Sequence, residues 1–438
     1  MIVRDPVHGD VEFTEPERAV LDTPEVQRLR GIKQLGTSYL VYPGALHTRF
    51  DHSTGTMAVA KRIIRALRSS GNEIGEEDEL LVTVTSLLHD IAHVPFGHTF
   101  EDERKILPSH DRGDRVRAFL DDGELADVLV DLGIRQKVLE LLLSGEPLEN
   151  SLEVPWIAQI VKDAISSDLL DYLRRDSYFT GLEQNYDDRV FRYFILTDYD
   201  VGRSSKVVLA VNLGKEGMVR QDARSEVLHL LRMRYFLTER VYYHHAKQAS
   251  GAMVSKALEL SIRNGFAPSD LKWMNDWTLF EALKSRPLGK KLISCIEGRR
   301  LYKRALVLGP EIGASKRNEL ISLYNRPGHE RESMEETILD GLDQRGASVG
   351  EGDVIIHCPD LGTMKEARVF ARDEEGMVEK LHRHRRPISK DLDHIENQYL
   401  AIWNFFVFTR ADIAAKANEV ARGLFPSEGA NFRPKDYI

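Results

Sequence analysis

The sequence predicts a mostly α-helical protein that ends in a smaller α+β region. Apolar residues recur at helical spacing from Glu15 to about residue 265, a pattern that is typical of amphipathic helices. Strand-like segments are few and short by comparison. We therefore expect a helical domain with an N-terminal hairpin over residues 1–265 and a C-terminal helical and α+β region over residues 266–438.

The expected elements follow in order along the chain. The opening MIVRDPVHGDVEF alternates like a hairpin around a His8-Gly9 turn. Helical periodicity then breaks at GNEIGEEDE (71–79), at the SGEPLEN turn (144–150) and at the strand-like KVVLAVN (206–212). Residues 266–330 continue as helices, with FAPSD and SRPLG as start or linker signals. SVGEGDVIIHCPDL and KEARVFAR predict two strands, and one final helix is expected from about residue 388 to 425.

A histidine-aspartate pair, His89-Asp90, lies near the end of one apolar segment. Apolar residues at helical spacing lead up to it, at Leu80, Val84, Leu87, Leu88 and Ile91. An ionised carboxylate in such a place is costly unless it is paired or binds a metal. His93 follows one turn later, and Pro95 and Gly97 then end the helix before His98. For the pair alone, two hydrogen-bonded core histidines and a capping aspartate are the commoner explanation, so the pair by itself does not establish a metal site.

Further imidazoles and carboxylates could complete a metal site. Upstream, HTRFDHSTGT supplies His47, Arg49 and His52 just before an apolar helix. Downstream, DAISSDLLDYLRRD carries four carboxylates on an amphipathic helix, at Asp163, Asp168, Asp171 and Asp176. Imidazole and carboxylate ligands suit Mn, Fe, Zn, Ni or Mg better than they suit a thiolate-binding metal. In the alternative reading, Arg49 forms a structural ion pair, and Asp171 and Asp176 face solvent on a charged helix surface.

The order of these residues resembles the HD-domain metal-dependent phosphohydrolases, whose signature His52, His89-Asp90 and Asp168 match. DPVHGDVEF, DTPEVQRLRGIKQLGTSYLVYPGALHTRFDHSTGT, LLHDIAHVPFGHTFED and DLLDYLRRDSYFTG are more narrowly similar to the deoxynucleoside triphosphate (dNTP) triphosphohydrolases. The branch that the chain most resembles contains the vertebrate sterile-alpha-motif and HD-domain dNTPase. The resemblance covers about residues 2–260. It implies an HD-domain helical fold and metal-dependent cleavage of a dNTP to a deoxynucleoside and inorganic triphosphate.

The resemblance also implies a role for each matching residue. His52, His89, Asp90 and Asp168 would hold the metal, and the catalytic cluster would be His98, Glu101, His110 and His93. The substrate would contact Gln34, Leu35, Arg49, Tyr172, Asp176, Arg234, Tyr242 and His244. In this set Arg49, His93 and Arg234 face phosphates, whereas Tyr172 and Asp176 discriminate the deoxyribose. The chain departs from the family at Glu101, where relatives have Asp, and at Leu169, where many have Lys.

Regulation is a separate expectation. Asp22, Gln27 and Arg30 match positions that recognise an activating guanine nucleotide at a subunit interface in regulated relatives. The resemblance thus implies a homo-oligomer, a dimer or tetramer, that GTP or a dNTP activates. In the alternative reading this segment is only a helix capped by Asp22 or Thr23. The basic run at residues 382–386 could bind an anion such as a neighbouring subunit's nucleotide or nucleic acid, but a solvated loop is the favoured explanation.

Composition agrees with a soluble enzyme. The chain of 438 residues carries a net charge of −9, which argues against a dedicated nucleic-acid coat. Its two cysteines, Cys295 and Cys358, suggest neither a disulfide framework nor a thiolate metal site. No signal peptide or long apolar run appears, so we expect a cytoplasmic location without membrane contact. Two alternative functions stay open: a nucleotidase, phosphodiesterase or single-strand nuclease with the same metal site, and a non-catalytic nucleotide-sensing module.

Overall fold

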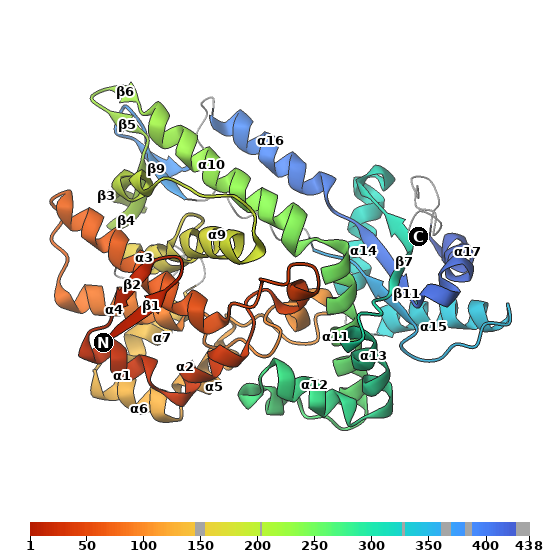
Figure 1. Cartoon of the computed structure of the whole chain (residues 1–438). Coiled ribbons are helices and arrows are strands. Elements are labelled where there is room, and N and C mark those ends of the chain that lie inside the picture. The colour runs from red at the N-terminus through yellow and green to blue at the C-terminus, as the bar shows by residue number, and fades with distance from the viewer. Residues whose placement is uncertain (145–153, 202–203, 326–328, 361–368, 382–387, 426–438) are drawn as a thin grey trace.

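Helices dominate the computed structural model, which describes residues 1–144, 154–201, 204–325, 329–360, 369–381 and 388–425 (Figure 1). The α-helices are α1 Glu15–Leu21, α2 Pro24–Gln27, α3 Arg49–Ser69, α4 Glu76–Leu88, α5 Gly113–Leu120, α6 Glu124–Asp131, α7 Arg135–Leu143, α8 Pro155–Lys162, α9 Ser167–Thr180, α10 Gln221–Leu237, α11 His245–Arg263, α12 Asp276–Lys284, α13 Pro287–Glu297, α14 Ala314–Asn325, α15 His329–Asp343, α16 Ile388–Ala401 and α17 Ala414–Leu424. The strands are β1 Ile2–Asp5, β2 Gly9–Glu12, β3 Phe194–Val201, β4 Ser204–Asn212, β5 Gly214–Lys215, β6 Met218–Val219, β7 Lys303–Leu308, β8 Val354–His357, β9 Phe370–Arg372, β10 Val378–Lys380 and β11 Phe405–Thr409. The predicted fold class is confirmed.

Local chemistry explains where the helices of the first half begin and end. Thr14 and Thr48 form capping boxes with Glu17 and Asp51, which satisfy free backbone N–H groups at the starts of α1 and α3. At its C-terminal end, α4 stops at Leu88, earlier than the sequence suggests, and His89 is the C-capping residue. The His-Asp pair therefore lies at the helix end, as predicted, but Asp90 and His93 belong to the loop that follows.

The predicted N-terminal hairpin and three of the predicted strand segments are confirmed. β1 and β2 pair antiparallel, with Asp5 opposite Gly9. The segments predicted as strands near residues 210, 355 and 370 form β4, β8 and β9. Helical expectations fail at β3 and β7, where the chain forms strands that pair with β4 and β11.

The prediction of a single C-terminal helix is wrong. The segment 388–425 forms α16, then β11, then α17. β11 lies between β7 and β8 in a three-stranded sheet, and all five of its residues are buried. A strand that is covered on both faces reads as a continuous apolar run, which periodicity does not distinguish from a buried helix.

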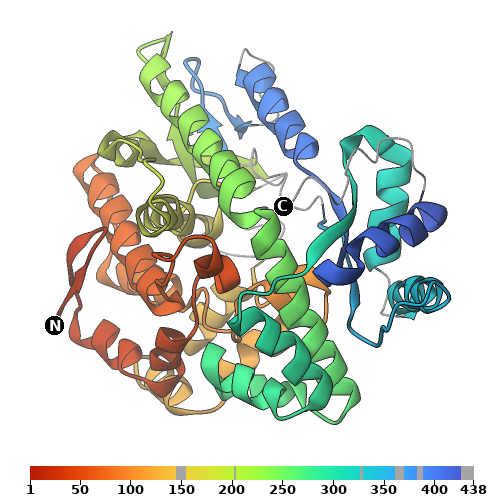
Figure 2. The same cartoon turned by 45° about the vertical axis from the view of Figure 1, so that its right-hand side comes forward.

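The C-terminal region folds back onto the first half of the chain. β9 pairs in parallel with β4, so the sheet of order β10-β9-β4-β3 contains strands from both sides of residue 265. α16 packs along α10, and both views show the two helices side by side (Figures 1 and 2). The domain boundary at residue 265 remains a prediction. β4 and β9 nonetheless tie the two regions together, because their ladder crosses that boundary.

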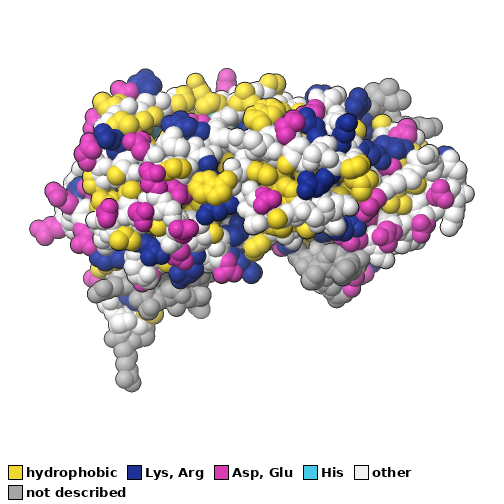
Figure 3. All heavy atoms as spheres, turned by 90° about the horizontal axis from the view of Figure 1, so that it is seen from below, with side chains coloured by type: hydrophobic (Ala, Val, Ile, Leu, Met, Phe, Trp, Pro, Cys, Tyr) yellow, Lys and Arg dark blue, Asp and Glu magenta, His cyan; other side chains and the backbone are white. Residues whose placement is uncertain are grey.

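The surface of the molecule carries many charged side chains, and some predicted segments fall outside the described residues. Acidic and basic side chains are interspersed on the face in Figure 3. Within the described ranges, no helix has both the length and the apolar character needed to cross a membrane. The basic run 382–386 lies outside the described residues, as do all but the first residue of the SGEPLEN turn and the first four of KEARVFAR.

Candidate active site

The ends of three helices bring the predicted metal ligands together. His52 is in the first turn of α3, Asp168 is in the first turn of α9, and His89 caps the end of α4. α3 packs against both α4 and α9, which fixes these three ends relative to one another. The side chain of Ser166 accepts a hydrogen bond from the backbone of Leu169 and so defines where α9 begins.

The ligand atoms of His52, His89 and Asp168 converge. His52 Nε2 lies 3.0 Å from Asp168 Oδ1 and 3.1 Å from His89 Nε2. The three residues form a group whose ligand atoms all lie within 4.8 Å of one another. Asp90 borders the group, because its two carboxylate oxygens lie 3.5 Å from His89 Nε2 and 3.7 Å from His52 Nε2.

The hydrogen bonds behind the two imidazoles make this group fit a divalent cation. Nδ1 of His52 lies 2.7 Å from an Asp171 oxygen, and Nδ1 of His89 lies 2.8 Å from the Ser86 carbonyl oxygen. Because both partners only accept, each Nδ1 must carry the hydrogen, and in the neutral rings each Nε2 then presents a lone pair. Two lone pairs face each other beside a carboxylate, and this arrangement is repulsive unless a cation lies between them. Without a metal ion, a proton can take the place of the cation. The hydrogen bonds of His52 with Asp168 and Asp171 then outweigh the effect of burial and raise the pKa of His52 to about 10.

Asp90 is held by an arginine from the start of α3. Nη1 of Arg49 donates to Asp90 Oδ2 over 2.5 Å. Although burial alone would raise it, the charge of Arg49, together with the neighbouring His89 and His93 imidazoles, holds the pKa of Asp90 well below its usual value. The loop passes close to the guanidinium, because a Cβ at Gly97 would lie only 2.7 Å from Arg49 Nη2. Asp90 is therefore ionised, and its Oδ1, which Arg49 does not bind and which lies near His89 Nε2, is available as an oxygen ligand.

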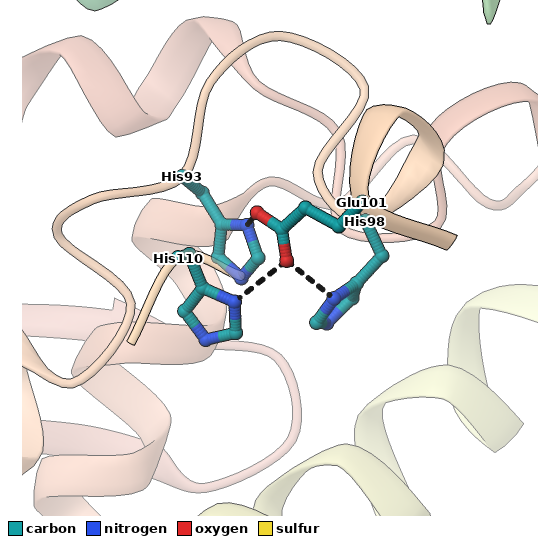
Figure 4. Close-up of side chains that lie close together, drawn as sticks. All are labelled: His93, His98, Glu101 and His110. Atoms are coloured by element: carbon teal, nitrogen blue, oxygen red, sulfur yellow. Dashed lines mark hydrogen bonds and ion pairs between the residues drawn. The ribbon is translucent and has the colours of Figure 1, made fainter. Parts of the chain in front are cut away.

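His93, His98, Glu101 and His110 form a second cluster (Figure 4), which reaches the first group through contacts of His93 and His110 with Asp90. Glu101 Oε2 accepts from His110 Nδ1 at 3.0 Å and pairs with His98 Nδ1 at 3.4 Å. The His93 ring stacks on His110 with their centroids 3.8 Å apart. Burial and the nearby charges of Arg49 and His110 lower the pKa of His93, so that its ring is neutral.

This cluster fits proton transfer better than metal binding. Both oxygens of Glu101 are already engaged, Oε1 by the Arg115 guanidinium at 2.5 Å and Oε2 by His110 and His98, so an incoming cation would have to displace one of these partners. Burial opposes ionisation of Glu101, but its bonds with His110 and His98 lower its pKa far below the usual value. The negative charge of Glu101 in turn outweighs desolvation and raises the pKa of His98. The His98 side chain is 49% exposed, the most open of the four, so it is the one that a substrate can reach.

The expected sugar-binding residues form a second buried network. Asp176 accepts from the Tyr242 hydroxyl at 2.6 Å and pairs with His47 Nε2 at 2.9 Å, so both of its oxygens are engaged. Burial and the Asp176 charge raise the pKa of Tyr242 well above its usual value, which keeps its hydroxyl a donor. Tyr172 lies one turn before Asp176 on α9 and is half-buried. Arg234 is close enough to Tyr242 to influence it electrostatically.

Three other expected substrate residues take defined positions. Gln34 borders the phosphate side, because its carbonyl oxygen accepts from Arg49 Nη2 at 3.4 Å. Within the described residues, the buried side-chain oxygen of Gln34 has no hydrogen-bond donor. Leu35 next to it is 9% exposed. His244 caps α11 by accepting from the Ala246 backbone at 3.2 Å, and its ring lies edge-on to Tyr42.

The proposed regulatory residues lie together on and around α2. The Gln27 amide donates to the Leu21 carbonyl and accepts from Arg30 Nε, each over 2.8 Å. Asp22 and Arg30 are exposed. Arg28 was not singled out in the sequence, yet its guanidinium donates to the carbonyls of His93 and Ile91. The residue that follows α2 is thus in direct contact with the loop that carries His93.

The family model for the HD domain matches residues 49–172, and the model for the HD associated region matches residues 219–428. An uncharacterized protein of Methanocaldococcus jannaschii is 27% identical over 410 residues, which are 93% of this chain and 78% of that protein. The deoxynucleoside triphosphate triphosphohydrolase SAMHD1 of Bos taurus is 29% identical over 286 residues, which are 58% of this chain and 46% of that protein. The chain thus spans less than half the length of this relative.

Solved structures share the fold over nearly the whole chain. A phosphohydrolase from Bacteroides thetaiotaomicron superimposes with a TM-score of 0.66 at 21% identity and covers 94% of this chain and 99% of its own. A hypothetical protein from Aquifex aeolicus gives a TM-score of 0.68 at 22% identity, with 96% and 99% covered. At these identities the likeness concerns the fold alone.

Proposed function

Because this chain belongs to the HD-domain phosphohydrolases, we propose that it is a metal-dependent dNTP triphosphohydrolase. The products would be a deoxynucleoside and inorganic triphosphate. The observation that carries the proposal is the juxtaposition of the two clusters at Asp90. His93 Nε2 lies 3.2 Å and His110 Nε2 lies 3.8 Å from Asp90 Oδ1, while Asp90 also borders His52 and His89. A cation site and a proton-transfer site that share one carboxylate suit the hydrolysis of a phosphate ester.

The metal ligands in this proposal are His52, His89, Asp90 and Asp168. A divalent cation bound there would polarise the α-phosphate and make a water molecule more acidic. The N/O ligand set is compatible with Mn, Mg, Fe, Zn or Ni. Around it, Arg49, His93 and Arg234 would bind the phosphate oxygens and neutralise the charge that develops on them.

The chemical step breaks the bond between the α-phosphorus and the 5′-oxygen of the deoxynucleoside. The water oxygen forms the new bond to phosphorus in line with the leaving oxygen and releases one proton, which would replace the proton that the catalytic cluster gives to the leaving oxygen. The leaving 5′-oxygen needs a proton, and His98 would donate it because Glu101 favours the protonated ring. Glu101 reaches the His98 ring even though it replaces the family's Asp, so the longer side chain still supplies the carboxylate.

Tyr172 and Asp176 would face the deoxyribose in this proposal. Tyr242 and His47 hold both oxygens of Asp176, which fixes the carboxylate in one orientation before a sugar arrives. A preorganised acceptor discriminates better than a mobile one, because less entropy is lost on binding. We also propose that the chain works as a cytoplasmic homo-oligomer, and that GTP or a dNTP binding at Asp22, Gln27 and Arg30 raises its activity.

The test is a substrate panel with product analysis. The full chain would be incubated with dNTPs, NMPs, cyclic dinucleotides and single-stranded DNA, each with Mn, Mg and other divalent metals, with and without GTP. Liquid chromatography should find triphosphate and deoxynucleoside from dNTPs. Release of pyrophosphate or a monophosphate from a dNTP would reject this reaction.

The panel also tests a nucleotidase, phosphodiesterase or nuclease that uses the same metal site. Leu169, which stands where many relatives have Lys, is buried in the core and offers no cation to a phosphate. Turnover of an NMP, a cyclic dinucleotide or single-stranded DNA in place of dNTPs would favour that alternative. Failure to bind metal by elemental analysis would instead favour a non-catalytic nucleotide sensor.

A further inference from the structure

The N-terminal hairpin has a turn that points a histidine into the protein. Asp5 Oδ1 accepts from the backbone N–H groups of Val7 and His8 at 2.7 and 2.8 Å, which shapes the turn between β1 and β2. Gly9 completes it with a φ of 79°, a conformation that glycine adopts without strain. The His8 side chain is 2% exposed. A hairpin at the edge of the fold therefore contributes a buried imidazole.

That imidazole contacts the carboxylate behind the candidate metal ligand His52. His8 Nε2 lies 2.6 Å from Asp171 Oδ1, and Asp171 Oδ2 lies 2.7 Å from His52 Nδ1. The two oxygens of Asp171 also accept from the guanidinium of Arg175 at 2.8 and 2.9 Å, the two-pronged pairing of an ionised carboxylate. An ionised carboxylate only accepts, so both imidazole nitrogens that face it must carry hydrogen.

Arg175 closes the network. Its Nε and Nη2 donate to the two oxygens of Asp171 at 2.8 and 2.9 Å, and Nη2 also lies 2.9 Å from Asp5 Oδ2. The Asp171 carboxylate thus receives N–H groups from three residues that all lie at 2% exposure or less. Because the chain from Asp5 to His8 is itself fixed by the turn, neither oxygen of Asp171 is free to rotate away from His52.

We propose that Asp171, locked by Arg175 and by His8 of the N-terminal hairpin, is the positioning residue that sets the tautomer and orientation of His52 for the metal. Through His8, the N-terminal hairpin then helps to orient a ligand of the metal centre. Carboxylates that hold the far nitrogen of a metal-binding histidine raise its basicity and fix its ring. The inference rests on the proposed function only in that His52 binds the cation. It does not depend on the substrate.

Metal affinity is the direct test, and three substitutions address different parts of the network. Asp171→Asn keeps the shape but sets an amide N–H group against N–H donors, so His52 loses its fixed partner. His8→Ala removes one donor, whereas His8→Gln keeps an amide N–H that can reach Asp171. Arg4→Ala is the matched control, because the Arg4–Asp10 pair lies on the exposed side of the same hairpin.

Each full-length protein would be stripped with a chelator and titrated with Mn²⁺ by calorimetry. Asp171→Asn should weaken Mn²⁺ binding about 10-fold to 100-fold. His8→Ala should weaken it as well, His8→Gln should restore most of the loss, and Arg4→Ala should match the wild type. The visible absorption of the Co²⁺-loaded protein should shift in Asp171→Asn and stay unchanged in Arg4→Ala, because those bands report the ligand geometry rather than stability.

The outcomes separate this inference from the proposed function. Wild-type Mn²⁺ affinity and Co²⁺ spectra in a folded Asp171→Asn would overturn the inference. If that variant does not fold, equal affinities in His8→Ala, His8→Gln and the wild type would overturn it instead. A wild type that binds no Mn²⁺ would overturn both proposals. A wild type that binds Mn²⁺ but releases no triphosphate would reject the substrate while the positioning role stands.

Discussion

Gly55→Ala tests whether the charged face of α9 and the backbone of α3 fit as closely as the structure indicates. Gly55 lies three residues after His52 in α3. A Cβ at this position would lie 2.0 Å from Asp171 Oδ1 and 2.1 Å from Arg175 Nη2. Since ordinary contacts begin near 3.4 Å, the two side chains would have to move by roughly 1.4 Å, which breaks hydrogen-bond geometry.

The two effects of this substitution change the free energy of unfolding in opposite directions, so the sign of the measured change shows which effect is larger. Alanine in a helix interior is favoured over glycine by about 1 kcal/mol, which on its own predicts stabilisation. Disturbing a buried ion pair costs about 3–5 kcal/mol when one partner is lost. Because Gly55→Ala displaces the pair without removing a charge, we expect a net loss of roughly 2–3 kcal/mol and weaker binding of Mn²⁺.

Urea unfolding of the metal-free protein, followed by circular dichroism, measures the loss. Gly350→Ala is the control, because a Cβ there meets open space within 4 Å and its φ lies outside the left-handed region. It should change stability by no more than about 0.5 kcal/mol. A Gly55→Ala protein at least as stable as the wild type, with unchanged Mn²⁺ affinity, would refute the close packing of α3 on Asp171.

Four further predictions concern activity. Asp90→Ala should abolish metal content, measured by elemental analysis, and turnover; retained turnover would contradict the site. Glu101→Gln should move the alkaline fall of kcat to lower pH, because Glu101 raises the pKa of His98. The proton that His98 donates is lost as the pH rises through that pKa. An unchanged pH–rate profile would contradict the role of His98. Tyr242→Phe should lower kcat/KM for dNTPs about 10-fold, since it removes a hydrogen bond to a charged group worth about 1.5–3 kcal/mol, and equal kinetics would mean that Asp176 needs no such support. Added GTP or dNTP should raise the rate of the wild type, and a flat response across nucleotides would remove the regulatory proposal.

The candidate metal ligands could be predicted because the sequence states them directly. His89 and Asp90 are adjacent, and His52 and Asp168 fall in the family order. The residues that orient these ligands carry no such signal. The contact between His8 and Asp171 joins positions separated by 163 residues, and no periodicity or local motif encodes a contact of that range.

The fold could be predicted where local periodicity decides it and not where burial does. The helices of the first half follow from amphipathic spacing and from caps such as Thr48. β11 could not be predicted, because its five residues are buried on both faces between β7 and β8. Only the partner strands, one of them about a hundred residues earlier in the chain, make an extended conformation favourable for this segment.

The helix α9 shows why a charged helix face is ambiguous in a sequence. Leu169, Leu170 and Leu173 form its apolar face, and all three are buried. The alternative of a solvated acidic face at Asp171 and Asp176 is wrong, because the two residues are only 0% and 1% exposed. Amphipathic spacing separates apolar from polar positions, but it does not say whether a polar face meets water or a set of matching donors.

The distinguishing information lies on the opposing helix. α3 presents a glycine, Gly55, and an imidazole, His52, to the acidic face of α9. A glycine in the middle of a helix is unfavourable unless close packing requires it, and here it makes room for a carboxylate and a guanidinium. The HSTGT sequence of α3 and the acidic spacing of α9 thus have to be read together: a small residue one turn after a candidate metal ligand indicates that another helix brings its charges to that ligand.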